Sequence, residues 1–202
     1  MQAARGTSIG QSTGPGDESV CPTPPAASRL RVRWVFAVVA LLFYALDVGT
    51  KILAVSRLTD HADVSLVGDF LVLHLTRNAG AAFSTGTQYT VVLSCLAMLA
   101  VLVVLWVSRR AGSLVWAVAL GLLIAGVSGN LTDRLVRSPG PLRGHVIDFL
   151  MLPNWPVFNV ADMCINVAAG LILLQAFRGV RLDGTRGAHP APRIPGDPED
   201  SA

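Results

Sequence analysis

Charged residues are scarce in this 202-residue chain, because only 14% of its residues are Asp, Glu, Lys or Arg. A soluble domain carries about 25% charged residues. The hydrophobic share is 52% and the mean hydropathy is +0.55, which excludes an ordinary soluble globule and a disordered chain. The net charge is only +3, and the arginines do not gather into one basic face, so a nucleic-acid partner is not expected.

Motifs for metals and common nucleophiles are also missing. The three cysteines, Cys21, Cys95 and Cys164, lack metal-ligand spacing and cannot all pair, so we predict no disulfide framework and no zinc. Residues 29–178 contain no G-x-S-x-G, and the whole sequence contains no H-E-x-x-H and no glycine-rich phosphate loop. Lys51 is the only lysine, and no span pairs it with a serine. We therefore expect chemistry that needs no metal and no cofactor.

Long apolar runs are what the chain has instead. Each contains 18 to 20 residues, enough to cross a hydrocarbon core of about 30 Å at about 1.5 Å per residue. The runs cover residues 34–53, 90–107, 114–131 and 158–177. Four such runs in one chain favour membrane spans over buried core helices. The sequence therefore predicts an all-α membrane protein with four transmembrane helices.

The segments around the runs divide the chain into three parts. Residues 1–28 and 179–202 are rich in small residues and Pro or Arg, and we expect both to form disordered cytoplasmic tails. Residues 29–178 form the predicted four-span domain. After the first run, a β-prone segment surrounds Gly68 and Asp69, which predicts a small hairpin on the membrane surface.

Basic residues predict how the spans are oriented. On one side of the membrane they stand close to the spans, at Arg29, Arg31, Arg33, Arg109, Arg110, Arg178, Arg181 and Arg186. On the other side they are spread over longer loops. The positive-inside rule therefore places both tails in the cytoplasm and loops 54–89 and 132–157 outside the cell.

Polar residues inside the runs carry the functional argument, since an Asp or Lys near a span centre costs about 2.5–3.5 kcal/mol. Three groups of them share a helix face by their spacing: Asp47, Thr50 and Lys51; Asn130, Asp133 and Arg134; Asn159, Asp162 and Asn166. The second group shares its face only if the third helix continues that far. All three groups, and Asp148 before the fourth span, are predicted to lie toward the outer membrane face.

Several of these residues also have a structural interpretation. Asp47 and Lys51 are four residues apart and fit a surface ion pair, which we favour for that pair. Asp133 beside Arg134 fits an ion pair or a helix terminator. Asp162 has no basic residue within a helical turn, and a buried unpaired carboxylate is costly. Asp162 therefore needs a partner from another segment, such as Arg134.

Asp148 is a second candidate partner for Asp162. Two carboxyl groups close together share a proton, so the pair contains an acid and a base. Such a pair can activate water for amide hydrolysis without a metal. Two other classes stay open. One is a small transporter or channel that binds a cation through its membrane Asp and Asn residues, although these residues cluster at one end. The other is a non-catalytic assembly protein.

Five ordered motifs across residues 34–177 resemble those of the lipoprotein signal peptidases (signal peptidase II), four-span aspartyl peptidases of bacterial membranes. The motifs are LDVGTK at 46–51, NAGAAF at 78–83, GNLTDR at 129–134, VIDF at 146–149 and FNVAD at 158–162. One such motif is weak, but five in order on the predicted side of four spans are specific.

The resemblance implies that Asp148 and Asp162 form a catalytic dyad. It implies supporting roles for Asp47, Lys51, Asn78, Gly80, Asn130, Asp133, Arg134 and Asn159. Asp47 and Lys51 would hold the first span against the site, and the hairpin would be a β-cradle that steadies the substrate. Arg134 would either stabilise the developing oxyanion, together with Asn78 and Asn130, or order the loop that carries Asp148.

The resemblance also implies the reaction. The substrates would be bacterial prolipoproteins that already carry a diacylglyceryl group, and the cut would fall just before the lipidated cysteine. The implied partners are these precursors and membrane lipids. We expect a monomer in the bacterial cytoplasmic membrane, with its active site at the extracytoplasmic face.

Overall fold

The computed structural model describes residues 26–80 and 89–186. Its elements are α1 (Ala26–Leu58), β1 (Val64–Val67), β2 (Leu71–Asn78), α2 (Thr90–Ser108), α3 (Leu114–Val136), β3 (Val146–Met151) and α4 (Val160–Phe177). Among these described residues, four helices are long and apolar enough to cross a membrane. The predicted fold of four membrane helices with a small hairpin is confirmed, and the structure adds a third strand.

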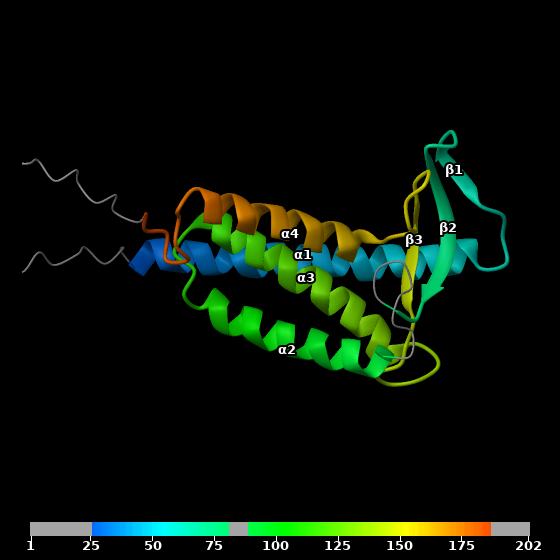
Figure 1. Cartoon of the computed structure of the whole chain (residues 1–202), viewed down its shortest axis with the longest axis horizontal. Helices are drawn as coiled ribbons and strands as arrows, with labels where there is room; N and C mark the ends of the chain where they lie inside the picture. Colours follow the sequence, from blue (N-terminus) through cyan, green and yellow to red (C-terminus); the bar gives the residue numbers. More distant parts are fainter. Residues whose placement is uncertain (1–25, 81–88, 187–202) are drawn as a thin grey trace, which may run out of the picture.

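The helices form a bundle with the sheet across one end (Figure 1). Helix α3 is central, because it packs against α1, α2 and α4. Both ends of the described chain lie at the opposite end of the bundle. We call these the sheet end and the tail end. The sheet end holds the C-termini of α1 and α3 and the N-termini of α2 and α4.

Two helices extend by more than one residue beyond the predicted runs. Helix α1 begins at Ala26, inside the segment expected to be a tail, and ends at Leu58. Helix α3 continues past residue 131 to Val136, so Asn130 and Arg134 lie on one continuous helix. A backbone that leaves the bilayer core still needs its N–H and C=O groups paired, and further helical turns pair them. Asn130, Asp133 and Arg134 therefore share one helix face, as their spacing predicts for a helix that continues this far.

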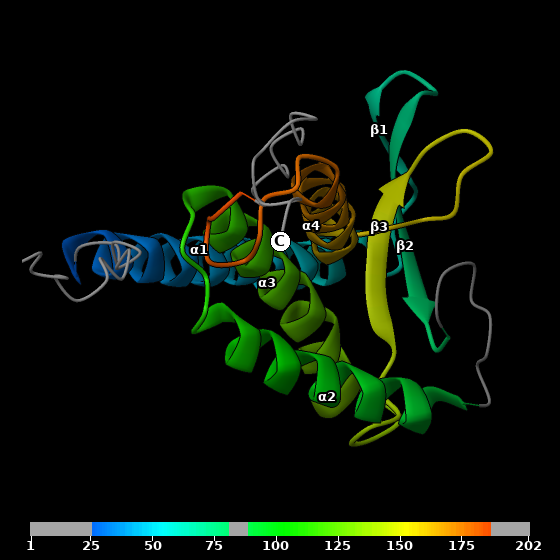
Figure 2. The ribbon, with the colours of Figure 1, turned by 60° about the vertical axis from the view of Figure 1, so that its left-hand side comes forward.

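The three strands form an antiparallel sheet in the order β1-β2-β3 (Figure 2). Strands β1 and β2 are the predicted hairpin, and Gly68 in the turn has φ +50°, a left-handed conformation that suits glycine. Strand β3 is not predicted by the sequence. Its first four residues are all buried, so no apolar–polar alternation marks it as a strand.

The segment after α4 begins as an ordered turn at the tail end. The N–H of Gly112 donates to the carbonyl of Leu182 at 2.9 Å, and Trp116 Nε1 donates to the carbonyl of Val180 at 3.3 Å. Residues 179–186 therefore pack against the link between α2 and α3, which differs from the expectation of a loose tail from residue 179. The other parts of the two expected tails, 1–25 and 187–202, lie outside the described residues.

Helices α3 and α4 approach closely at Gly126. A Cβ atom there would lie 2.5 Å from the carbonyl oxygen of Ala161 and 2.7 Å from Ile165 Cγ1. We expect Gly126→Ala to destabilise the bundle by about 1–3 kcal/mol, because the added methyl group overpacks this contact. Thermal unfolding in detergent measures the effect. The control is Gly170→Ala, because a Cβ at Gly170 meets nothing within 4 Å. Equal stability of the two variants would contradict the prediction.

Candidate active site

Asp162 is held by the start of its own helix. Asn159 is the N-cap of α4, and its side-chain oxygen accepts the backbone N–H of Asp162 at 3.0 Å. In return, Asp162 Oδ2 accepts the backbone N–H of Asn159 at 3.2 Å, which completes a capping box. From α3, Asn130 Nδ2 donates to Asp162 Oδ1 at 2.9 Å. Both carboxylate oxygens of Asp162 are therefore fixed by N–H donors.

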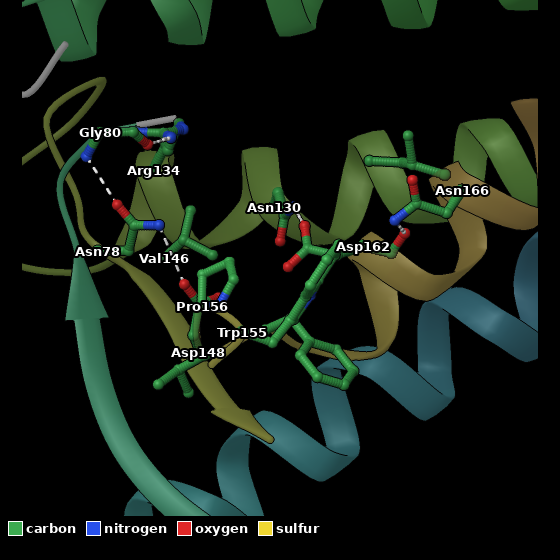
Figure 3. Close-up of a pocket in the computed structure, with 13 residues that line it drawn as sticks. Asn78, Gly80, Asn130, Arg134, Val146, Asp148, Trp155, Pro156, Asp162 and Asn166 are labelled. Carbon is green, nitrogen blue, oxygen red and sulfur yellow. Dashed lines mark hydrogen bonds between the residues drawn. The ribbon is translucent and has the colours of Figure 1, made fainter. Parts of the chain in front are cut away.

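Asp148 lies on β3 and is almost fully buried, at 3% exposed. Its Oδ1 accepts Asn159 Nδ2 at 2.6 Å, and its Oδ2 accepts Asn78 Nδ2 at 3.0 Å. The Asn78 amide is oriented by the backbone N–H of Gly80, which donates to Asn78 Oδ1 at 2.9 Å (Figure 3). Each Asp148 oxygen therefore faces the nitrogen of an asparagine amide.

Asn159 joins the two acidic residues through a single side chain. Its oxygen accepts from the Asp162 backbone, its nitrogen donates to Asp148, and it is fully buried. Asp148 and Asp162 both line one cavity of about 370 Å³ at the sheet end (Figure 3). The structure therefore brings these two residues together from different elements, β3 and α4.

Burial raises the pKa of Asp148 to about 6. The hydrogen bond from Asn78 lowers this pKa, the nearby charge of Asp162 raises it, and the hydrogen bond from Asn159 lowers it again. Asp148 therefore titrates around pH 6, where a carboxyl group is able to hold or release a proton during a reaction.

A buried ionic network centred on Lys51 lies behind this cavity. Lys51 Nζ lies 2.8 Å from Asp47 Oδ2 and 3.0 Å from Asp133 Oδ2. It also donates to Asn130 Oδ1 at 2.9 Å, so the other end of that amide, Nδ2, faces Asp162. The expected pair of Asp47 and Lys51 exists, but the expectation of a surface pair is wrong, since both side chains are about 1% exposed.

The two acidic residues of the network tie separate elements together. Asp47 Oδ1 accepts the backbone N–H of Ala161 at 2.8 Å, which fastens α1 to the start of α4. Asp133 Oδ2 accepts the backbone N–H of Ile147 at 3.2 Å, which fastens α3 to β3. Asp133 also pairs with Arg137, one helical turn further on. Asp47 and Asp133 thus hold the two elements that carry the cavity's carboxyl groups.

Arg134 pairs with neither of the residues that the sequence suggested, its neighbour at 133 and Asp162. Its guanidinium donates to the carbonyl of Ala79 at 3.4 Å and to the carbonyl of Gly80. It also lines the cavity. These contacts order the backbone after β2, where Asn78 is held. The rest of that motif, residues 81–83, lies outside the described residues.

Part of the cavity wall was not among the predicted site residues. These wall residues are Val146, Trp155, Pro156, Val157, Phe158, Ile165 and Asn166. Asn166 shares the helix face of Asp162, so spacing pointed to it, and the aromatic and proline residues around the start of the fourth run were a signal for Trp155, Pro156 and Phe158. Except for Asn166, these residues add apolar groups to the cavity wall. No group of His, Cys, Asp and Glu in the described ranges is arranged to hold a metal ion.

Comparison with known proteins agrees with the family that the five sequence motifs resemble. The family model for Signal peptidase (SPase) II matches residues 39–178. A lipoprotein signal peptidase of Mycolicibacterium smegmatis is 49% identical over 162 residues, which are 80% of this chain and 66% of that protein. One from Mycobacterium tuberculosis is 44% identical over 88% of this chain and 85% of its own length. One from Streptomyces coelicolor is 44% identical over 77% of this chain and 76% of its own length.

Solved structures support the fold. A bacterial membrane enzyme structure, obtained by the in meso method at 2.3 Å resolution, superposes with a TM-score of 0.64 at 22% identity. The match covers 71% of this chain and 88% of that one. A second such structure, at 1.9 Å resolution, gives a TM-score of 0.60 at 23% identity. The arrangement of four helices with a sheet at one end is therefore shared with known membrane enzymes.

Proposed function

Because the chain belongs to the signal peptidase II family, the aspartic-type lipoprotein signal peptidases, we propose that Asp148 and Asp162 are its catalytic dyad. The observation that carries this assignment is the Asn159 side chain, which binds one acidic residue through its nitrogen and the other through its oxygen. A single buried amide thereby sets how β3 and α4 present their carboxyl groups to the same cavity.

In the proposed reaction, Asp162 is the base and Asp148 is the acid. Asp162 lies in the first turn of α4, where a helix N-terminus favours negative charge. It takes a proton from a water molecule held between the two groups, and the water oxygen attacks the scissile carbonyl. Asp148 donates its proton to the carbonyl oxygen. Return of a proton to the leaving amine breaks the peptide bond.

The neighbouring amides hold this arrangement in place. Asn78 and Asn159 donate to Asp148, and Asn130 donates to Asp162, so each carboxyl group has little freedom to turn. Arg134 keeps the backbone at Gly80 beside the cavity, which favours a role in ordering this region. Arg134 also lines the cavity, so its positive charge would favour an oxyanion that develops there.

The proposed substrates are bacterial prolipoproteins that carry a diacylglyceryl group, cut just before the lipidated cysteine. The apolar cavity wall formed by Trp155, Phe158 and Ile165 suits such a substrate, since it lies beside the polar groups that would act on the peptide bond. Acyl chains lying along the spans would contribute about 0.8 kcal/mol per buried methylene. The sheet is proposed to steady the extended peptide.

We also propose that the sheet end faces the outside of the bacterial cytoplasmic membrane and that the protein acts as a monomer. The arginines near the start of α1, between α2 and α3 and after α4 lie at the tail end, and they outnumber those at the sheet end, which include Arg57, Arg134 and Arg137. The positive-inside rule assigns the more basic side to the cytoplasm. Precursors exported across the membrane would then present their lipidated cysteine at the depth of the dyad.

The substrate class is tested with two matched precursors, one carrying the diacylglyceryl group and one unmodified. We expect the purified protein to convert only the lipidated form to the shorter product in a gel-shift assay. Mass spectrometry of the product should place the new N-terminus at the lipidated cysteine. Equal cleavage of both precursors would reject the proposed substrate class and leave the peptidase assignment intact.

The pH dependence tests the acid and base roles. With a pKa of about 6, Asp148 holds its proton below that pH and loses it as the pH rises. If Asp148 donates that proton, kcat/KM should fall above about pH 6, by up to about tenfold per pH unit. Cleavage rates measured from pH 5 to pH 8 check this. A rate that instead rises through pH 6 and stays high would assign the base role to Asp148.

A further inference from the structure

A second cavity, of about 450 Å³, lies behind the strands that carry part of the candidate site. Side chains alternate between the two faces of a sheet. Asn78 and Val146 are cross-strand partners whose side chains line the first cavity. Their neighbours Arg77 and Ile147 are also partners, and they line the second. The strand pair β2–β3 therefore separates the two cavities.

The polar groups lining this second cavity are all able to donate hydrogen bonds, and no carboxylate lines it. They are Arg77, Arg137, Ser138 and His145. Arg77 and Ser138 are exposed and His145 is half-buried, and in the described part of the chain none of the three side chains bonds to another protein group, so all three are free to contact a ligand. Arg137 is held in place by its ion pair with Asp133. A cavity with two guanidinium groups and spare donors suits an anion, and phosphate in particular.

The position of this cavity favours a lipid as the source of the phosphate. Val55 lies in the last turn of α1, and Val136 is the last residue of α3 and is 73% exposed. These two apolar residues and the basic groups line the same cavity, where two spans end. A phospholipid has this pattern too, with a charged phosphate directly above its acyl chains.

We propose that the cavity lined by Arg77, Arg137, Ser138 and His145 binds the phosphate group of an anionic phospholipid. Bound phosphate would join Arg77 on β2 to Arg137 at the end of α3. Since Arg77 directly precedes Asn78, occupancy would also steady the strand that donates to Asp148. That last consequence rests on the proposed function, whereas lipid binding itself does not.

The test measures lipid binding by the full-length protein in detergent, using native mass spectrometry with short-chain phosphatidylglycerol. Phosphatidylcholine, which has no net charge, and inorganic phosphate are tested in parallel. We expect phosphatidylglycerol to bind more tightly than phosphatidylcholine, and Arg77→Gln to weaken its binding about five-fold. The matched control is Arg143→Gln, which removes the same charge from an exposed residue that does not line the cavity.

Three results would overturn the proposal. Equal binding of the two lipids would mean that the headgroup charge is not recognised. Equal weakening by Arg77→Gln and Arg143→Gln would assign the effect to general surface charge. Displacement of phosphatidylglycerol by an equal concentration of inorganic phosphate would make free phosphate the ligand. Because no peptide cleavage is measured, these results do not depend on whether Asp148 and Asp162 are catalytic.

Discussion

Replacing Asp162 with Asn is expected to slow cleavage of a lipidated precursor by about 10²–10⁴-fold, and Asp148→Asn by a similar factor. Asn keeps the shape of the side chain but neither accepts nor donates the proton that the proposed reaction transfers. The effect should fall on kcat more than on KM, because the cavity wall that would contact the substrate is unchanged. Single-turnover gel-shift assays with purified protein measure it.

The matched control for both variants is Asp69→Asn, an exposed acidic residue in the turn between β1 and β2. It should cleave at the unmodified rate. The double variant Asp148→Asn/Asp162→Asn should be no slower than the slower single variant, since the two groups act as a unit. If either single variant cleaved the precursor as fast as the unmodified protein, the dyad assignment would be wrong.

Replacing Lys51 with Met is expected to destabilise the protein by about 3–5 kcal/mol. The change removes the cation between Asp47 and Asp133 and leaves buried negative charge without compensation. Asp133 keeps its ion pair with Arg137, so Asp47 bears most of the loss. Asn130 also loses the partner that orients its amide toward the dyad. Thermal unfolding in detergent measures the change in stability.

A compensating substitution distinguishes lost charge balance from lost packing. In Lys51→Met/Asp47→Asn the uncompensated carboxylate is gone, so we expect part of the stability to return. The amide oxygen of the new Asn still accepts the Ala161 N–H that fastens α1 to α4. If the double variant were as unstable as Lys51→Met alone, the penalty would come from the loss of the lysine's packing. Exposed Arg57→Met is a control for removing a cation from α1.

Much of this fold could be predicted from the sequence, because its strongest signals are local. The four apolar runs gave the four helices, and the β-prone residues around Gly68 gave the hairpin. Strand β3 has no comparable signal. It is identified by pairing with β2, where Thr76 lies opposite Asp148 in a contact that links distant parts of the chain.

The site was predictable as a set of residues but not as a set of contacts. Spacing placed Asp162 and Asn159 on one helix face, and the capping box follows from that local pattern. The partners of Asp148 do not follow from a local pattern, since Asn78 is 70 residues away in sequence. Arg134 illustrates the same limit. Its sequence neighbours suggested ion pairs, whereas the fold directs it to backbone carbonyl groups beside the cavity.

At residue 159, the N-cap of α4, fewer residue types suit the structure than helix capping alone would allow. Ser, Thr, Asp and Asn all serve as N-caps, because each offers an oxygen to the helix. At residue 159 the side chain must accept from Asp162 through one atom and donate to Asp148 through another, and among these four only Asn has separate acceptor and donor atoms. Asn159→Asp would keep the helix while setting a third acid beside the other two. Ser, Thr or Asp would cap an ordinary helix, but at residue 159 none of them supplies both hydrogen bonds that Asn159 makes.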